Sequence, residues 1–107
     1  MPELPPPAPT GLSATPYYEV ALNVKWNSVP EVHNYKLERC EVCTIVSEPP
    51  VASLCSWPWY WEEVYSRVDT SFIDRNVTLG IAYRYRVAAN NAFGESEPSE
   101  EIGVVYW

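Results

Sequence analysis

Apolar and aromatic residues alternate with polar ones along segment 83–89, and this alternation predicts a β-strand. One face of that strand would carry Tyr83, Tyr85, Val87 and Ala89. A strand with a period of two presents one face to a core and the other to water. Asn90, Asn91 and Gly94 follow, and these residue types favour a loop that reverses the chain.

Five further segments have the alternation or composition of strands: 9–14, 20–26, 35–40, 70–74 and 102–106. In segment 20–26 the apolar residues share one face, so Trp26 is expected to be buried at the end of that strand. In segment 35–40, Tyr35 and Leu37 alternate with charged residues. Short strands separated by turn residues predict an all-β domain.

The composition agrees with a single strand-and-loop domain. The chain has 107 residues, of which 47% are hydrophobic, and it has 11 prolines but 4 glycines. A chain of this length forms one domain by default, and proline at this density opposes long helices. The proline-rich segment 1–8 is predicted to be an extended linker, and the domain is predicted to span 9–107.

The segment 41–58 lies between the third predicted strand and the next one, and it predicts a hairpin. Val42, Thr44 and Val46 continue the alternation of the third strand. Pro49-Pro50 would turn the chain, and 52–55 would return along it. We therefore expect a protruding insertion in this part of the domain.

The C-terminal third of the chain resembles a fibronectin type III domain. The motif is Tyr83-Arg84-Tyr85-Arg86-Val87-Ala88-Ala89-Asn90, followed by Gly94-Glu95-Ser96-Glu97-Pro98-Ser99. Segment 77–83 is similar to the family's corner, in which the hydroxyl of the tyrosine, here Tyr83, caps a backbone group upstream. Trp61-Glu62-Glu63-Val64 is similar to the start of the family's fourth strand.

The resemblance implies a seven-stranded antiparallel immunoglobulin-like β-sandwich with the insertion between its third and fourth strands. The core residues that it and the alternation together predict are Trp26, Tyr35, Leu37, Val77, Tyr83, Tyr85 and Val87. A module of this family usually binds another protein or spaces its neighbours, and rarely catalyses.

The three cysteines lie at or within the insertion, at Cys40, Cys43 and Cys55. Cys43 and Cys55 could face each other in the hairpin and form a disulfide, with Cys40 as an alternative partner, or all three could be free thiols. Cys40 and Cys43 also form a C-x2-C pair that Cys55 and His33 could complete as a zinc site. The second half of a zinc motif is missing, so no metal is predicted.

Trp57, Trp59 and Trp61 alternate in the segment 57–61, with Tyr60 between the last two. An exposed row of such residues would be a protein-binding surface, because tryptophan and tyrosine supply much of the energy of interfaces. The same row could instead pack as a small satellite core. Trp57, Trp59 and Tyr60 are the predicted contact residues, and Trp61 is the one expected to be structural.

The remaining features argue against several classes of function but do not identify the function itself. The net charge of −7 disfavours nucleic acid, and no apolar run is long enough to cross a membrane. Neighbouring carboxylates such as Glu62 and Glu63 would point to opposite faces, so they form no catalytic pair, and no cofactor motif is present. Asn76-Val77-Thr78 is a possible N-glycosylation site.

The sequence thus predicts a non-catalytic interaction or spacer module of a larger multidomain protein, at the cell surface or outside the cell. It would contact a protein partner and the neighbouring domains of its own chain. The alternatives are a scaffold module of a cytoskeletal or sarcomeric type inside the cell, and an accessory module of a polysaccharide-degrading enzyme.

Overall fold

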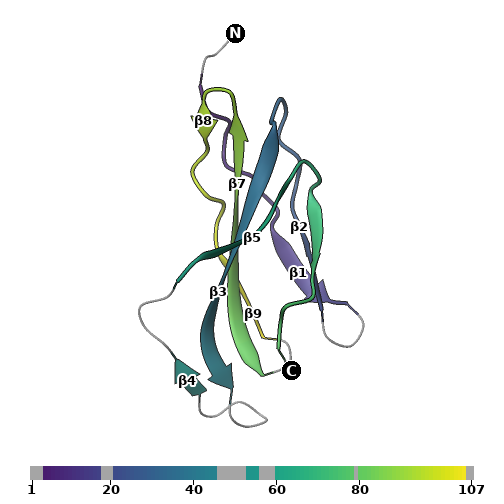
Figure 1. Ribbon diagram of the computed structural model, residues 1–107, viewed down its shortest axis with the longest axis vertical. Coiled ribbons are helices and arrows are strands. Elements are labelled where there is room, and N and C mark those ends of the chain that lie inside the picture. Colours follow the sequence, from purple (N-terminus) through teal and green to yellow (C-terminus); the bar gives the residue numbers. More distant parts are fainter. Residues whose placement is uncertain (1–3, 18–20, 46–52, 56–59, 79, 106–107) are drawn as a thin grey trace.

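Two antiparallel sheets pack face to face in the structure, a computed structural model that describes residues 4–17, 21–45, 53–55, 60–78 and 80–105 (Figure 1). The smaller sheet has the strand order β1-β2-β6, with bounds Ser13–Pro16, Leu22–Lys25 and Ser71–Asp74. The larger sheet consists of β3 (Asn34–Ile45), β4 (Ser53–Cys55), β5 (Glu62–Arg67), β7 (Ile81–Asn91), β8 (Gly94–Glu95) and β9 (Ile102–Val105). The predicted fold class is therefore confirmed.

The nine strands of the described residues reduce to the seven that were predicted. β4 belongs to the insertion, and β8 is a two-residue strand that closes the turn after β7. The third predicted strand lies in the larger sheet, across from β2, so β2 and β3 place their inner faces against each other. This is the arrangement that a two-layer sandwich needs in order to bury both inner faces.

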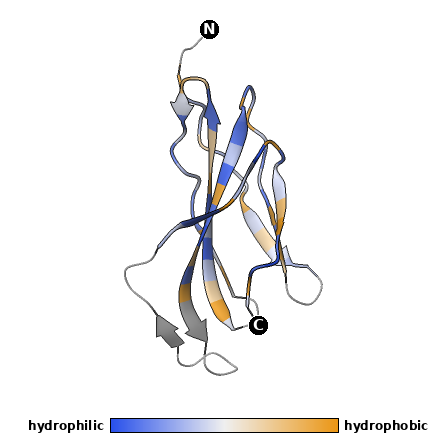
Figure 2. Ribbon diagram, in the orientation of Figure 1, coloured by the Kyte–Doolittle hydropathy of each residue, from blue (hydrophilic) through white to orange (hydrophobic). Residues whose placement is uncertain are grey.

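The core lies between the two inner faces, and every predicted core residue is in it. The buried cluster consists of Leu22, Val24, Trp26, Val29, Tyr35, Leu37, Val77, Tyr83, Tyr85, Val87 and Ala89. Hydrophobic and hydrophilic bands accordingly succeed each other along β3 and β7 (Figure 2). Trp26 makes edge-to-face contacts with Tyr35 and Tyr65, at centroid distances of 5.6 and 5.9 Å. Such pairs stabilise a core beyond the area that they bury.

Two buried tyrosine hydroxyls accept hydrogen bonds from loop backbone. The amide of Thr78 donates to the hydroxyl of Tyr83 at 2.7 Å, which confirms the predicted corner. The amide of Val29 donates to the hydroxyl of Tyr35 at 2.8 Å. Each ring thus fills the core while its hydroxyl satisfies an amide that would otherwise be unpaired.

The first strand begins later than the sequence predicts, at Ser13 and not at Pro9. Gly11 has a φ of 72°, in the left-handed region, so the chain cannot run as one extended strand from 9 to 14. A Cβ added to Gly11 would lie 2.5 Å from the side-chain amide nitrogen of Asn27. The turn at Gly11 lets the amide of Asn27 donate to the carbonyl of Thr10 at 2.8 Å.

The proline-rich segment lies against the turn between β7 and β8. The side-chain amide of Asn91 donates to the carbonyl of Leu4 at 3.1 Å, and Pro6 is buried. A Cβ on Gly94 would lie 3.2 Å from Cγ of Pro5. From Leu4 onward the segment therefore contacts the sandwich, and its role as a linker between domains remains a prediction.

The predicted hairpin is present at the far end of β3. Cys43, Thr44 and Ile45 pair with Cys55, Leu54 and Ser53. The same end of β3 pairs with the start of β7 on its other side, so the hairpin extends the larger sheet (Figure 1). The register with β7 shifts between Glu41 and Cys43, which marks a β-bulge where the insertion begins. The predicted turn at Pro49-Pro50 lies outside the described residues.

Candidate functional site

The aromatic residues of the insertion lead into β5, which is an edge strand. Among the described strands, β5 pairs with β3 alone. It begins at Glu62, directly after Tyr60 and Trp61. Tyr60 is 78% exposed, the largest exposed fraction among the bulky hydrophobic side chains that are described. Trp57 and Trp59, the other predicted contact residues of this segment, lie outside the described residues. Tyr60 is therefore the visible part of the predicted contact surface.

Trp61 is held in place on the outer face of the larger sheet. The guanidinium carbon of Arg86 lies 4.1 Å from the centre of the Trp61 ring, and Nε of Arg86 donates to Glu38 at 2.8 Å. A planar guanidinium stacks well on an indole, and the carboxylate fixes its orientation. The stack anchors the chain directly beside Tyr60, in agreement with the structural role predicted for Trp61.

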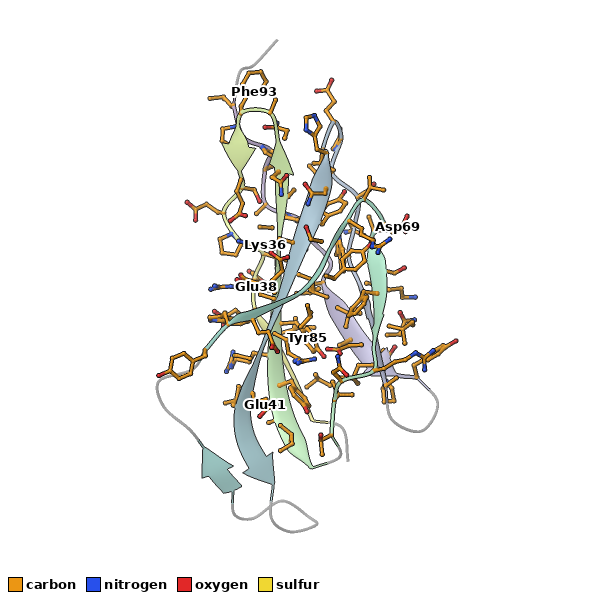
Figure 3. All side chains as sticks on the ribbon, in the orientation of Figure 1. Lys36, Glu38, Glu41, Asp69, Tyr85 and Phe93 are labelled. Carbon is orange, nitrogen blue, oxygen red and sulfur yellow. The ribbon has the colours of Figure 1, made fainter. Side chains whose placement is uncertain are left out.

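Three exposed carboxylates lie on β5, which begins two residues after Tyr60, and on its partner strand β3. Glu62 and Glu63 follow Trp61, and Glu41 lies on β3 close to the bulge; all three are exposed. Glu41 is labelled in Figure 3, in the part of β3 that lies toward β4. The edge therefore combines an exposed aromatic ring with negative charge, and it would repel phosphate and attract cationic groups.

Beneath this edge, β5 is tied to the core by a buried ionic cluster that the sequence did not reveal. Nη1 of Arg39 donates to both carboxylate oxygens of Asp74, at 2.8 and 2.7 Å, and Nη2 donates to Glu62 at 2.8 Å. The hydroxyl of Tyr85 donates to Asp74 at 2.8 Å. Asp74 is 1% exposed, so its charge depends on these partners.

The environment of the cluster shifts two pKa values. Burial, together with the neighbouring charge of Asp74, raises the pKa of the Tyr85 hydroxyl well above its usual range. Burial by itself would lower the pKa of the Arg39 guanidinium, but the hydrogen bonds and charge of Asp74 outweigh that effect and raise it. Arg39 thus stays charged and the hydroxyl of Tyr85 stays protonated. Asp74 also accepts a hydrogen bond in the turn that follows β6, from the amide of Asn76 at 3.1 Å.

The three cysteines occupy different positions in the larger sheet. Cys40 is a buried free thiol opposite Arg84, and its pKa is raised by burial and by the nearby charge of Glu101. Cys43 lies directly opposite Cys55 in the backbone register. His33 lies at the other end of β3, where its amide donates to the carbonyl of Asn90. The set Cys40, Cys43, Cys55 and His33 is therefore spread over the length of a 12-residue strand.

The other candidate sites offer few side chains that could bind a ligand or react. Asn76 is exposed, as a glycosylation site must be, and its modification stays a prediction. A pocket of about 480 Å³ lies between segments 8–12 and 98–102, with Glu100 as its one titratable side chain. The described residues contain no cluster of three or more His, Cys, Asp or Glu that could hold a metal ion. They also include no helix long and apolar enough to cross a membrane.

Solved structures share this arrangement of strands, whereas no protein-family model and no curated protein matches the chain. A structure of the titin kinase and its flanking domains is 23% identical with a TM-score of 0.69, and the match covers 94% of this chain but 17% of that one. The twitchin kinase region from C. elegans is 20% identical with a TM-score of 0.72, covering 94% and 16%. A Fn3-like protein from Clostridium thermocellum is 26% identical with a TM-score of 0.68, covering 95% and 94%.

These likenesses and the topology define the class of protein as an antiparallel two-sheet sandwich of the immunoglobulin-like kind. Within that class, the chain has the fibronectin type III fold, as its sequence motifs indicated. The chain spans about a sixth of the titin and twitchin chains, which carry further domains beside the matched one.

Proposed function

We propose that this chain is a protein-interaction and spacer module of a larger protein at the cell surface or outside the cell, and that Trp57, Trp59 and Tyr60 form its contact surface. The observation that carries the proposal is the exposure of Tyr60, 78%, beside an indole that Arg86 holds in place. An exposed aromatic ring on an anchored segment loses little freedom when a partner covers it, which favours binding.

The position of this surface suits a module in a row of domains. Tyr60 lies beside the middle of the larger sheet, away from the turn where Leu4 contacts Asn91. Molecules bound at the edge of β5 would therefore leave the N-terminal end of the sandwich free for a neighbouring domain. Spacer and binding functions can then operate in the same module.

Site-specific photocrosslinking tests the proposal directly. A photoreactive phenylalanine analogue replaces Tyr60 in one variant and Val68 in the control, because Val68 is also apolar and 61% exposed but lies in the turn after β5. We expect one discrete partner to be crosslinked from position 60 and not from position 68. Equal, diffuse labelling from both positions would contradict a contact surface at Tyr60.

A second candidate is a scaffold module inside the cell, alongside other domains of the same chain. The similarity to chains that contain the titin and twitchin kinase regions favours it. Thiol counting on protein isolated from its native source separates the two candidates. One free thiol supports the extracellular candidate, and three support the intracellular one.

A further inference from the structure

We propose that Cys43 and Cys55 form a disulfide across the β3–β4 hairpin and that Cys40 remains a thiol. The sequence left three possibilities open, namely a Cys43–Cys55 bridge, a bridge to Cys40, and no bridge. The strand register now distinguishes the three positions. The inference goes beyond the proposed function, because it assigns a covalent bond whose existence does not depend on any partner.

The register is the first argument for this pairing. Cys43 is directly opposite Cys55, and Thr44 and Ile45 continue the same antiparallel ladder with Leu54 and Ser53. Residues directly opposite in antiparallel strands have Cα atoms about 4.5–5.5 Å apart. A disulfide requires a Cα separation of about 4.4–6.8 Å, so the backbone already holds the two positions at a bridging distance.

The position of Cys40 argues against its participation. Cys40 is opposite Arg84 and Cys43 is opposite Ala82, so Cys40 lies two ladder steps from Cys43 along the sheet. With a rise of about 3.3 Å per residue and a strand spacing of about 4.8 Å, the Cα atoms of Cys40 and Cys55 are about 8 Å apart. That exceeds the roughly 7 Å beyond which a bridge requires backbone movement. Cys40 is also buried, with the raised pKa of a thiol that ionises poorly.

The bond forms by thiol–disulfide exchange with a small disulfide such as glutathione disulfide. The thiolate of one cysteine attacks that disulfide, forms a mixed disulfide and releases one glutathione thiolate, which takes up the proton of the first cysteine. The second cysteine loses its proton, attacks the mixed disulfide and releases the second glutathione. Two cysteine thiols are oxidised by two electrons, and one glutathione disulfide is reduced to two thiols.

A Cys43–Cys55 disulfide would hold together the two strands from which the insertion extends. The bridge would join β3 to β4 immediately before the segment that leads from Cys55 to Tyr60. In the described residues this hairpin has three ladder pairs. Short hairpins of this size are marginal in water, so a covalent link at the ladder would determine whether the insertion stays paired.

Peptide mapping after alkylation tests the pairing. The protein is equilibrated with a glutathione buffer at an oxidising potential, denatured, alkylated without reductant and cleaved after glutamate. Cleavage at Glu41 separates Cys40 from the other two cysteines, whereas trypsin would leave all three in one peptide because no Lys or Arg lies between Cys40 and Arg67. We expect alkylation at Cys40 alone, and a peptide with Cys43 and Cys55 that is two hydrogen masses lighter than its reduced form.

Variants provide a second measurement. Cys40→Ser should keep the bond and the higher melting temperature of the oxidised over the reduced protein, whereas Cys43→Ser and Cys55→Ser should lose both. Alkylation of all three cysteines after oxidation, a bridged Cys40, or a bound metal that protects the thiols would overturn the inference. None of these outcomes depends on the contact surface, so failure here is distinguishable from failure of the proposed function.

Discussion

Tryptophan occurs in two contrasting surroundings in this molecule, at Trp26 in the core and at Trp61 on the edge. Trp26 is 5% exposed and touches Tyr35 and Tyr65 edge to face. Trp61 is half-buried, stacks on Arg86, and directly follows Tyr60, which is 78% exposed. The Trp26 ring packs in the core between the two sheets. The Trp61 ring anchors the chain at the start of β5 and leaves Tyr60 exposed to water.

The difference teaches that the aromatic content of this chain serves two purposes. In the core, rings contact other rings, and tyrosine hydroxyls are used to pair loop amides. On the edge, a single ring is held by a charged stack, which allows the adjacent ring to remain exposed. We therefore expect substitutions in the core to lower stability and substitutions at the edge to lower binding, and the experiments below test that separation.

The largest effect is expected from the ionic cluster, which joins the two regions. Asp74→Ala leaves the guanidinium of Arg39 buried without its main partner, and removing one member of a buried pair costs about 3–5 kcal/mol. Urea denaturation measures the loss. Glu62→Ala is the matched control, because its carboxylate is 67% exposed and a surface partner contributes about 0–1 kcal/mol. Equal losses from both variants would refute the central role of Asp74.

The second-largest loss of stability is expected from the corner at 77–83, where the hydroxyl of Tyr83 accepts a backbone hydrogen bond. Tyr83→Phe removes the acceptor for the amide of Thr78 but keeps the buried ring. An amide left unsatisfied costs about 1–3 kcal/mol, so the midpoint of chemical denaturation should fall with an unchanged m-value. Tyr60→Phe removes a hydroxyl from the exposed ring and should leave the midpoint unchanged. A wild-type midpoint for Tyr83→Phe would show that the corner bond contributes nothing.

Alkaline pH provides a third, smaller test of the core. The pKa of Tyr85 is raised in the folded state, so above about pH 10 the unfolded chain loses this proton while the folded chain keeps it. Stability is therefore fully present below the unfolded pKa and falls as pH rises, by at most about 1.4 kcal/mol per pH unit from this group. In Tyr85→Phe the slope above pH 10 should be shallower. If the slope is the same in the variant and in the unmodified chain, Tyr85 is excluded as the source of the loss of stability above pH 10.

The smallest effect is expected from the stack on the edge. A cation–π contact at a partly exposed site contributes about 0.5–1 kcal/mol. A double-mutant cycle with Arg86→Ala and Trp61→Ala should give a coupling free energy in this range, measured by denaturation. Arg86→Ala with Tyr60→Ala serves as the comparison pair and should show no coupling. Strong coupling in both cycles would mean that Tyr60 is packed and not free.

Much of the sandwich could be predicted because alternation reports burial directly. The run from Tyr83 to Ala89, and Tyr35 and Leu37 on the third strand, have their apolar faces inward as the pattern requires. The same alternation places Arg39 inward, two residues after Leu37. That position was the available signal for a buried charge, but its partner Asp74 is 35 residues away and only the fold brings the two together.

Other features depend on backbone geometry that a residue pattern does not encode. The bulge between Glu41 and Cys43 changes the register between β3 and β7, and nothing in the local residues predicts it. The left-handed turn at Gly11 delays the first strand because Asn27, distant in sequence, packs against it. For the contact surface, the sequence identified Tyr60 and Trp61 by residue type, whereas their difference in exposure depends on Arg86 from another strand.

The most direct test of the separation between core and edge is a paired measurement on the double variant Trp57→Ala/Trp59→Ala. Its affinity for the partner crosslinked at position 60 and its free energy of unfolding are determined side by side with those of the unmodified chain. We predict that affinity falls at least tenfold while the free energy of unfolding changes by less than about 1 kcal/mol, since hot-spot rings contribute about 2 kcal/mol or more to binding. Retained affinity together with a destabilised fold would contradict the account and identify the tryptophans as core.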